Sequence, residues 1–270
     1  MIPFKILPIA PSISVTGVVT AFDVIRPTGF DFSGEMHDFW EIVFLESGRV
    51  EATADGTVIR MIPGQLLFHR PMEFHRIRCL NEKPAHLLIL SFTASGEEMA
   101  FFQRKLFSLG EEQRRLLFRC VHQFAEFLAD PKNARTAMNQ GRLLLELLLC
   151  ELTESRQIRP VNPDPSAARY REIVGVLESS CDQSLTLCEI ARRCRISEST
   201  LKQTFHRYCD RGVMQYFTEL KIRKACSLLQ QGKSIPEICD LLGFENPTYF
   251  YRVFKQKIGL TPRQYRLKNR

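Results

Sequence analysis

Four side chains within the first 75 residues have the chemistry to bind a metal ion or a polar ligand: His37, Glu41, His69 and His75. Imidazole and carboxylate groups are ligands that iron, manganese and zinc accept. By side-chain alternation, His37 and Glu41 share one face of a strand, where His75 can join them. The same groups can also line a pocket for an organic molecule or form hydrogen bonds within a core.

A second set of side chains has the chemistry to read DNA. Two predicted helices, residues 197–208 and 246–258, each have an apolar face and an opposite face of long polar or cationic side chains. Such residues at i, i+3, i+4 and i+7 can reach base edges and phosphates in a major groove. A solvated helix face is the alternative. The outward residues are Ser199, Lys202, Gln203, His206, Thr248, Tyr251, Arg252 and Lys255.

Length and composition restrict the class of protein. A chain of 270 residues predicts about two domains, and 44% apolar with 25% charged residues is ordinary for a globular protein. No apolar run approaches the ~18–20 residues that span a bilayer, and the first residues do not resemble a signal peptide. Nine cysteines without a Cys-x-x-Cys pair favour reduced thiols. We therefore expect a cytoplasmic protein without a membrane partner.

The positive charge is concentrated at one end of the chain. Residues 164–270 contain 19 basic and 11 acidic residues, whereas residues 1–163 contain 18 and 19. Residues 252–270 contain seven basic residues and no acidic one. This asymmetry indicates a polyanionic partner for the C-terminal part, either nucleic acid or an anionic membrane.

The first 95 residues are predicted to form a small β-barrel or sandwich, because short apolar or alternating runs are separated by turn signals such as Asp55-Gly56 and Pro63-Gly64. The expected strands are residues 15–22, 39–45, 50–53, 65–68 and 87–92.

In residues 96–155 the apolar residues recur at helical spacing. The run 143–149 is apolar over most of a helix, so it must be covered on more than one side. It is either a core helix under the barrel or a subunit interface, and we expect a homodimer through this helical unit. Three prolines mark residues 156–165 as a linker to a helical domain at 166–270.

The basic region contains an internal repeat. Residues 186–191 match residues 234–239 at an offset of 48, and after one extra residue the offset becomes 49. The later matches include Phe205 with Phe254 and Tyr216 with Tyr265. Two matching stretches indicate a duplicated structural unit.

Each copy has the local features of a helix-turn-helix. Thr186 and Ser234 can cap helices, with a glutamate three residues further on completing a capping box. Gly243 supplies a left-handed turn in the second copy, while Arg195 stands at that place in the first. A left-handed arginine costs on the order of 1 kcal/mol.

The second copy resembles the signature of AraC/XylS-type transcriptional regulators. The resemblance covers residues 243–266, which read GFENPTYFYRVFKQKIGLTPRQYR. In the first copy, Asp210 and Val213 stand in place of Gly259 and Pro262. Aspartate tolerates a left-handed backbone better than most residues, so we expect the first copy to fold and to contribute less to affinity.

The N-terminal part resembles the cupin-like sensor barrels of the same family. The matching segments are residues 36–41 (MHDFWE), Gly48 and residues 63–75 (PGQLLFHRPMEFH). Metal-dependent cupins hold a divalent ion with a His/Glu cluster whose first motif has two histidines separated by one residue. Here Phe39 or Glu35 stands at the partner position of His37, so we expect no metal and no cofactor.

We instead expect His37, Glu41, His69 and His75 to line a site for a small-molecule effector, a sugar or related metabolite. Trp40, Phe68 and Phe74 can stack on a sugar ring or belong to the core. No Gly-rich phosphate loop or nucleophile constellation is present in the sequence.

The fold class expected is α+β and multidomain: a cupin-like β-barrel (1–95), a helical dimerisation unit (96–155), a linker (156–165) and a double helix-turn-helix domain (166–270). The expected function is a ligand-responsive regulator that binds double-stranded DNA and, as the resemblance implies, RNA polymerase. The alternatives are a metal-dependent cupin enzyme fused to a DNA-binding domain, and a constitutive DNA-binding protein whose barrel only dimerises.

Overall fold

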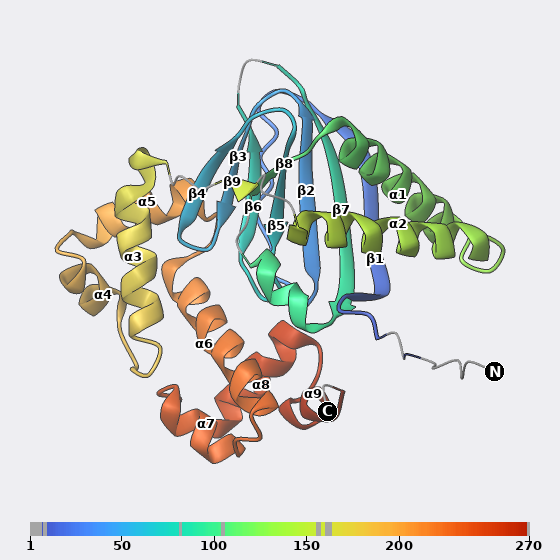
Figure 1. Cartoon of the computed structure of the whole chain (residues 1–270). Coiled ribbons are helices and arrows are strands. Elements are labelled where there is room, and N and C mark those ends of the chain that lie inside the picture. Colours follow the sequence, from blue (N-terminus) through green and yellow to red (C-terminus); the bar gives the residue numbers. More distant parts are fainter. Residues whose placement is uncertain are drawn as a thin grey trace.

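The computed structural model describes residue 7 and residues 10–80, 83–103, 106–154, 158–159 and 164–268. Within these ranges the N-terminal part forms two antiparallel sheets that pack as a flattened barrel (Figure 1). One sheet has the order β1-β7-β2-β5-β8-β9 and the other β4-β3-β6. The strands are β1 (Ser14–Arg26), β2 (Trp40–Ser47), β3 (Val50–Ala54), β4 (Thr57–Met61), β5 (Gln65–His69), β6 (His75–Cys79), β7 (Ala85–Ser95), β8 (Leu106–Ser108) and β9 (Ile158–Arg159).

All five predicted strands are present, and the structure adds four that the pattern did not predict. In β6 the alternation is hidden because Arg76 is buried, where it pairs with Asp31 at 2.6 Å. The larger sheet also continues beyond residue 95, since β8 pairs with β5 and β9 pairs with β8.

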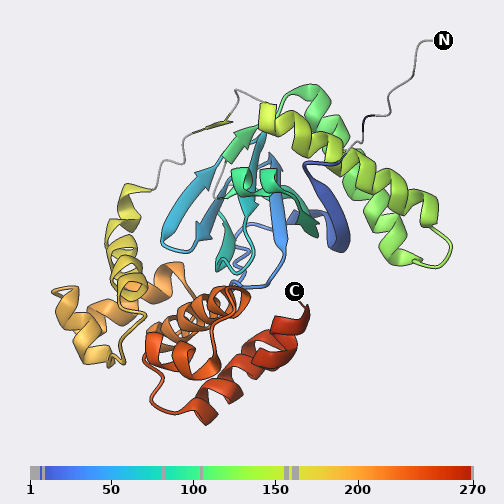
Figure 2. The ribbon, with the colours of Figure 1, turned by 60° about the horizontal axis from the view of Figure 1, so that its bottom comes forward.

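Two long helices cover the outer face of the larger sheet: α1 (Glu111–Ala129) and α2 (Arg135–Glu154) (Figure 2). A 3-10 helix, η1 (Glu97–Phe102), leads toward them. Leu145 and Leu148 are fully buried in the core shared with the sheet, whereas Leu143 and Leu147 are 56% and 49% exposed. The apolar run in α2 is therefore mainly part of the core, with Leu143 and Leu147 on its exposed side.

The C-terminal part contains two helix-turn-helix units joined by a long helix, α6 (Figure 1). The first unit is α4–α5 and the second is α7–α8. After the short η2 (Pro165–Ala167), the helices are α3 (Ala168–Ser179), α4 (Leu187–Arg193), α5 (Glu198–Tyr208), α6 (Val213–Gln230), α7 (Ile235–Leu241), α8 (Pro247–Ile258) and α9 (Pro262–Lys268).

The predicted capping boxes are present at the start of α4 and α7. The hydroxyls of Thr186 and Ser234 accept the backbone N–H of Glu189 and Glu237, and each glutamate carboxylate accepts the N–H of its cap residue. The duplicated sequence therefore produces the same N-terminal cap on the first helix of both units.

Both units turn through a residue with a left-handed backbone. Arg195 has φ 54° and Gly243 has φ 59°, so the arginine does adopt the left-handed conformation. A Cβ at Gly243 would lie 2.9 Å from the carbonyl oxygen of Asp182, which excludes larger residues there. Among the described residues other than glycine, positive φ occurs at Asp55, Met72 and Arg195. Asp210 is not one of them, so the expectation of a left-handed backbone at Asp210 was wrong. Helix α5 instead ends at the extended Cys209.

Part of the predicted linker, residues 156–157 and 160–163, lies outside the described residues. Its far end contacts the barrel, because the backbone N–H of Asp164 donates to the carbonyl oxygen of Val58 at 2.8 Å. Among the helices of the described ranges, none combines the length and apolarity needed to cross a membrane.

Candidate functional site

A cavity of about 310 Å³ opens into the barrel. One end is polar, with Glu35, Glu41, His69, His75 and Ser91, and the walls carry the rings of four phenylalanines. The remaining lining residues include two arginines and several aliphatic side chains. The aromatic residues are Phe22, Phe30, Phe32 and Phe39. A cavity of this size and composition suits a small molecule with both polar and apolar surface.

Strand register places three of the polar residues side by side. Glu41 on β2 is opposite His69 on β5 and opposite Ser91 on β7. The Ser91 hydroxyl donates to Glu41 Oε2 at 2.8 Å, and both residues are buried. This arrangement fixes the Glu41 carboxylate at the inner end of the cavity.

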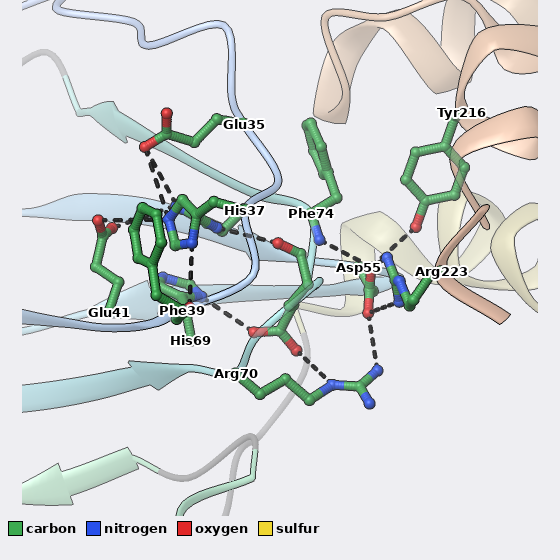
Figure 3. A network of polar contacts seen from close by, with 12 residues as sticks. Glu35, His37, Phe39, Glu41, Asp55, His69, Arg70, Phe74, Tyr216 and Arg223 are labelled. Atoms are coloured by element: carbon green, nitrogen blue, oxygen red, sulfur yellow. Dashed lines mark hydrogen bonds and ion pairs between the residues drawn. The ribbon is translucent and has the colours of Figure 1, made fainter. Parts of the chain in front are cut away.

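His37 and Glu35 reach the cluster from a loop. His37 precedes β2, so the expectation that it shares a strand with Glu41 was wrong. Glu35 is held by a pair of backbone hydrogen bonds with His75, each 2.9 Å long. His37 Nε2 lies 3.8 Å from Glu41 Oε2 (Figure 3). His75 Nε2 lies 3.3 Å from Glu41 Oε1.

The cluster shifts the proton affinities of its members. Burial would lower the pKa of His75, but contacts with Glu35 and Glu41 and the charge of Glu41 raise it to about 10. Burial would raise the pKa of Glu41, yet the contacts with His37 and His75 hold it well below its usual value. Burial also lowers the pKa of His69, whose Nδ1 lies 3.1 Å from Glu73 Oε2.

A five-residue loop, Arg70–Phe74, connects this cavity to the two helix-turn-helix units. His69 and His75 lie at its two ends, and their rings stack with centroids 4.5 Å apart. Met72 is buried in the core of the second helix-turn-helix unit, together with residues of α6–α9. Phe74 is fully buried in the core of the first unit, where its ring meets Tyr216 edge-on at 5.7 Å.

Asp55, at the turn between β3 and β4, forms the polar centre of the same interface (Figure 3). Its carboxylate is completely buried and accepts hydrogen bonds from both Nη atoms of Arg223 on α6, at 2.6 and 2.7 Å. It also accepts the Tyr216 hydroxyl, the Phe74 backbone N–H and Arg70 Nη2, each at 3.2 Å. The barrel and the DNA-binding helices are therefore joined through a buried ion pair.

The structure places all eight predicted DNA-contacting side chains on exposed faces of α5 and α8, away from their apolar cores. The Arg252 guanidinium lies 5.4 Å from the centre of the Tyr249 ring. His206 is paired with Asp210 at 3.1 Å. These faces remain accessible while the barrel is docked.

Three of the four predicted effector residues line the cavity, while His37 lies beside it and contacts Glu41. Trp40, Phe68 and Phe74 belong to apolar cores and do not line it. Sequence reasoning missed Ser91, because nothing in an apolar strand marks a serine as facing inward. It also missed Asp55, whose partner Arg223 is 168 residues away.

Comparison with known proteins matches two parts of the chain to family models. Residues 24–152 match the AraC-like ligand binding domain, and residues 190–268 match a helix-turn-helix domain. The HTH-type transcriptional activator RhaR of Klebsiella pneumoniae is 26% identical over 259 residues, 88% of this chain and 89% of that protein. The melibiose operon regulatory protein of Escherichia coli is 29% identical over 96 residues, 35% of this chain and 32% of that protein.

Among solved structures, ToxT from Vibrio cholerae O395 bound to a methylnaphthalenyl butenoic acid aligns with a TM-score of 0.41 at 12% identity. The alignment covers 96% of this chain and 100% of that chain.

The buried ion pair leads to a stability prediction. Arg223→Met leaves the Asp55 carboxylate buried with weaker partners, and breaking such a pair costs about 3–5 kcal/mol. Denaturant unfolding of the full chain should show this loss. Arg115→Met, which removes an exposed ion pair with Glu111, should change the free energy of unfolding by less than about 1 kcal/mol. Equal small losses in both variants would contradict a central role for the pair.

Proposed function

The chain belongs to the AraC-type transcriptional regulators, and we propose that a small molecule bound beside His75 controls how its two recognition helices meet DNA. The loop Arg70–Phe74 is the observation that carries this proposal. Its two ends are histidines of the cavity, while Met72 and Phe74 are buried in the two helix-turn-helix cores. A ligand that moves His69 or His75 therefore shifts residues on which both DNA-reading units pack.

A second chain of contacts supports the same coupling. Arg211 donates to the carbonyl oxygen of Gly34 in the barrel at 3.1 Å, and to Glu219 Oε1 at 2.5 Å. Glu219 Oε1 also accepts a hydrogen bond from Lys257 Nζ of α8 at 2.6 Å. Gly34 directly precedes Glu35, so a change at the cavity reaches the second recognition helix through three polar contacts.

The effector we propose is a sugar or related metabolite. The polar end of the cavity can pair hydroxyl groups, and its phenylalanine rings can stack on the apolar face of a sugar ring. One relative points to the same class by name, since it is the melibiose operon regulatory protein of Escherichia coli. We assign no catalytic role to the cavity.

We propose that α5 and α8 enter successive major-groove faces about one turn, roughly 10 bp, apart. The reading side chains are then those exposed on the outward faces: Ser199, Lys202, Gln203, His206, Thr248, Tyr251, Arg252 and Lys255.

We further propose a cytoplasmic homodimer that contacts RNA polymerase. Leu143 and Leu147 lie one turn apart on α2 and are both exposed, which supports association through this helix. The nine free cysteines are consistent with a reducing compartment. The polymerase contact rests on likeness to a relative named as an activator.

The DNA assignment predicts two different losses. Arg252→Ala should cost about 1–3 kcal/mol on operator and relax the preference at one base position. Lys255→Ala should weaken operator and scrambled duplex alike and lower the salt slope by about one. Salt-titrated binding measures both, with Arg115→Ala on α1 as the charge-matched control. Equal losses on the two duplexes for Arg252→Ala would make it a phosphate contact instead.

The effector assignment predicts a loss of response. A panel of monosaccharides and sugar acids should contain a compound that changes operator affinity in the wild type. His37→Ala and His75→Ala should abolish that change, because His75 lines the cavity and His37 contacts Glu41 at its polar end. The exposed His122→Ala should keep it. If no compound acts on the wild type, or if the variants respond normally, the assignment of this cavity is wrong.

The dimer assignment is tested by charge. Leu143→Glu combined with Leu147→Glu puts two carboxylates into the proposed apolar contact, so light scattering should show a folded monomer. Ile62→Glu, at an exposed apolar residue of the barrel, should leave the dimer intact. A double variant that dimerises with an unchanged dissociation constant places the interface elsewhere.

A further inference from the structure

We infer that Glu35, His37, Glu41 and His75 together bind one divalent transition-metal ion, for which zinc fits the donor set best. Each residue offers one ligand atom, and the four atoms lie within 4.8 Å of one another. The inference rests on the proposed function in that it places the ion at the polar end of the proposed effector cavity. It differs from the sequence expectation because Glu35 supplies the fourth donor.

The spacing of the donors is that of ligands around an ion. The four histidine-to-carboxylate distances are 3.3, 3.6, 3.8 and 3.9 Å. Hydrogen bonds between nitrogen and oxygen are shorter, about 2.7–3.2 Å. Four ligands at the ~2.0–2.2 Å typical of zinc–nitrogen and zinc–oxygen bonds stand about 3.3–3.6 Å apart at tetrahedral corners. The two His75 distances, 3.3 and 3.6 Å, match these tetrahedral spacings, and none of the four is as short as a typical hydrogen bond, so the cluster is suited to a central cation.

The two imidazole rings are oriented as metal ligands. His37 Nδ1 lies 3.1 Å from the carbonyl oxygen of Phe39, and His75 Nδ1 lies 3.1 Å from that of Glu73. Because a carbonyl only accepts, each Nδ1 carries a proton, and each ring turns its Nε2 toward the carboxylates. Both Nε2 atoms are buried and have no hydrogen-bond partner. A metal cation between them would take the place of any proton on Nε2 and be coordinated by both nitrogens.

The surroundings supply the remaining features of such a site. The Ser91 hydroxyl holds the second oxygen of Glu41, as outer hydrogen bonds commonly hold metal-ligating carboxylates. Glu35, Glu41 and His75 also line the cavity, so a hydroxyl group of an effector has access to the ion. A second histidine–carboxylate cluster, Asp23 on β1 with His86 on β7 and His122 on α1, is partly exposed and offers a matched control.

Isothermal titration of chelator-stripped full-length protein with ZnCl₂ tests the inference. The wild type should bind one equivalent of zinc per chain. In Glu41→Gln and His75→Gln the affinity for this zinc should be at least a hundredfold lower. Outer-shell changes typically cost 10–100-fold, so Ser91→Ala should lower affinity about tenfold. His122→Gln should match the wild type. Ser91→Ala keeps every donor, so it remains informative if a ligand variant fails to fold, which circular dichroism reports.

Two results would overturn the inference. If the wild type binds no zinc beyond what Glu41→Gln and Ser91→Ala bind, the ions sit elsewhere. If the wild type binds none at all, a proton on His75 holds the carboxylates instead. Operator affinity is measured separately with the sugar panel in the presence of chelator. If the effector site is real and the metal site is not, the response to sugar persists although no zinc binds. If only the metal site is real, zinc binds but no sugar changes operator affinity.

Discussion

The completely buried carboxylate of Asp55 is the constraint on which the arrangement of the two halves depends. A buried charge is costly unless it is paired and hydrogen-bonded. Asp55 is at a tight turn with φ 47°, and its strongest partner, Arg223, comes from the long helix between the two DNA-reading units. The barrel must therefore remain docked on α6 for this charge to be satisfied, and docking in turn buries Met72 and Phe74 in the helix-turn-helix cores.

The same contact explains how chemistry in the barrel can affect DNA binding. The Phe74 backbone N–H binds Asp55, and the next residue, His75, contacts Glu41 in the cavity. Arg70 binds Asp55 from the other end of the loop and also contacts Glu73, the partner of His69 (Figure 3). Only a few covalent and polar links separate the cavity from α6. A ligand or ion that repositions His75 acts directly on the groups that hold the domains together.

Local sequence signals predicted the DNA-binding half well. The capping boxes of Thr186 and Ser234 and the turn at Gly243 involve residues close in sequence, so spacing alone reveals them. Long-range features were not predictable in this way. Glu35 joins the cluster only because a backbone bridge pairs it with His75, forty residues later. Leu145 and Leu148 resemble interface residues until the sheet beneath α2 is known. Asp55 reads as an ordinary turn residue until Arg223 is placed beside it.

The central claim is that Asp55 and the loop Arg70–Phe74 hold the DNA-binding units against the barrel. Cys150 on α2 and Cys188 on α4 are exposed, whereas the other seven cysteines are buried, so spin labels can be attached to one site in each half. Double electron–electron resonance on labelled chains diluted with unlabelled protein then reports the separation of the halves. The account predicts a single narrow distance distribution in the wild type and a much broader one in Asp55→Asn. An equally narrow distribution in Asp55→Asn, or an equally broad one in the wild type, would contradict it.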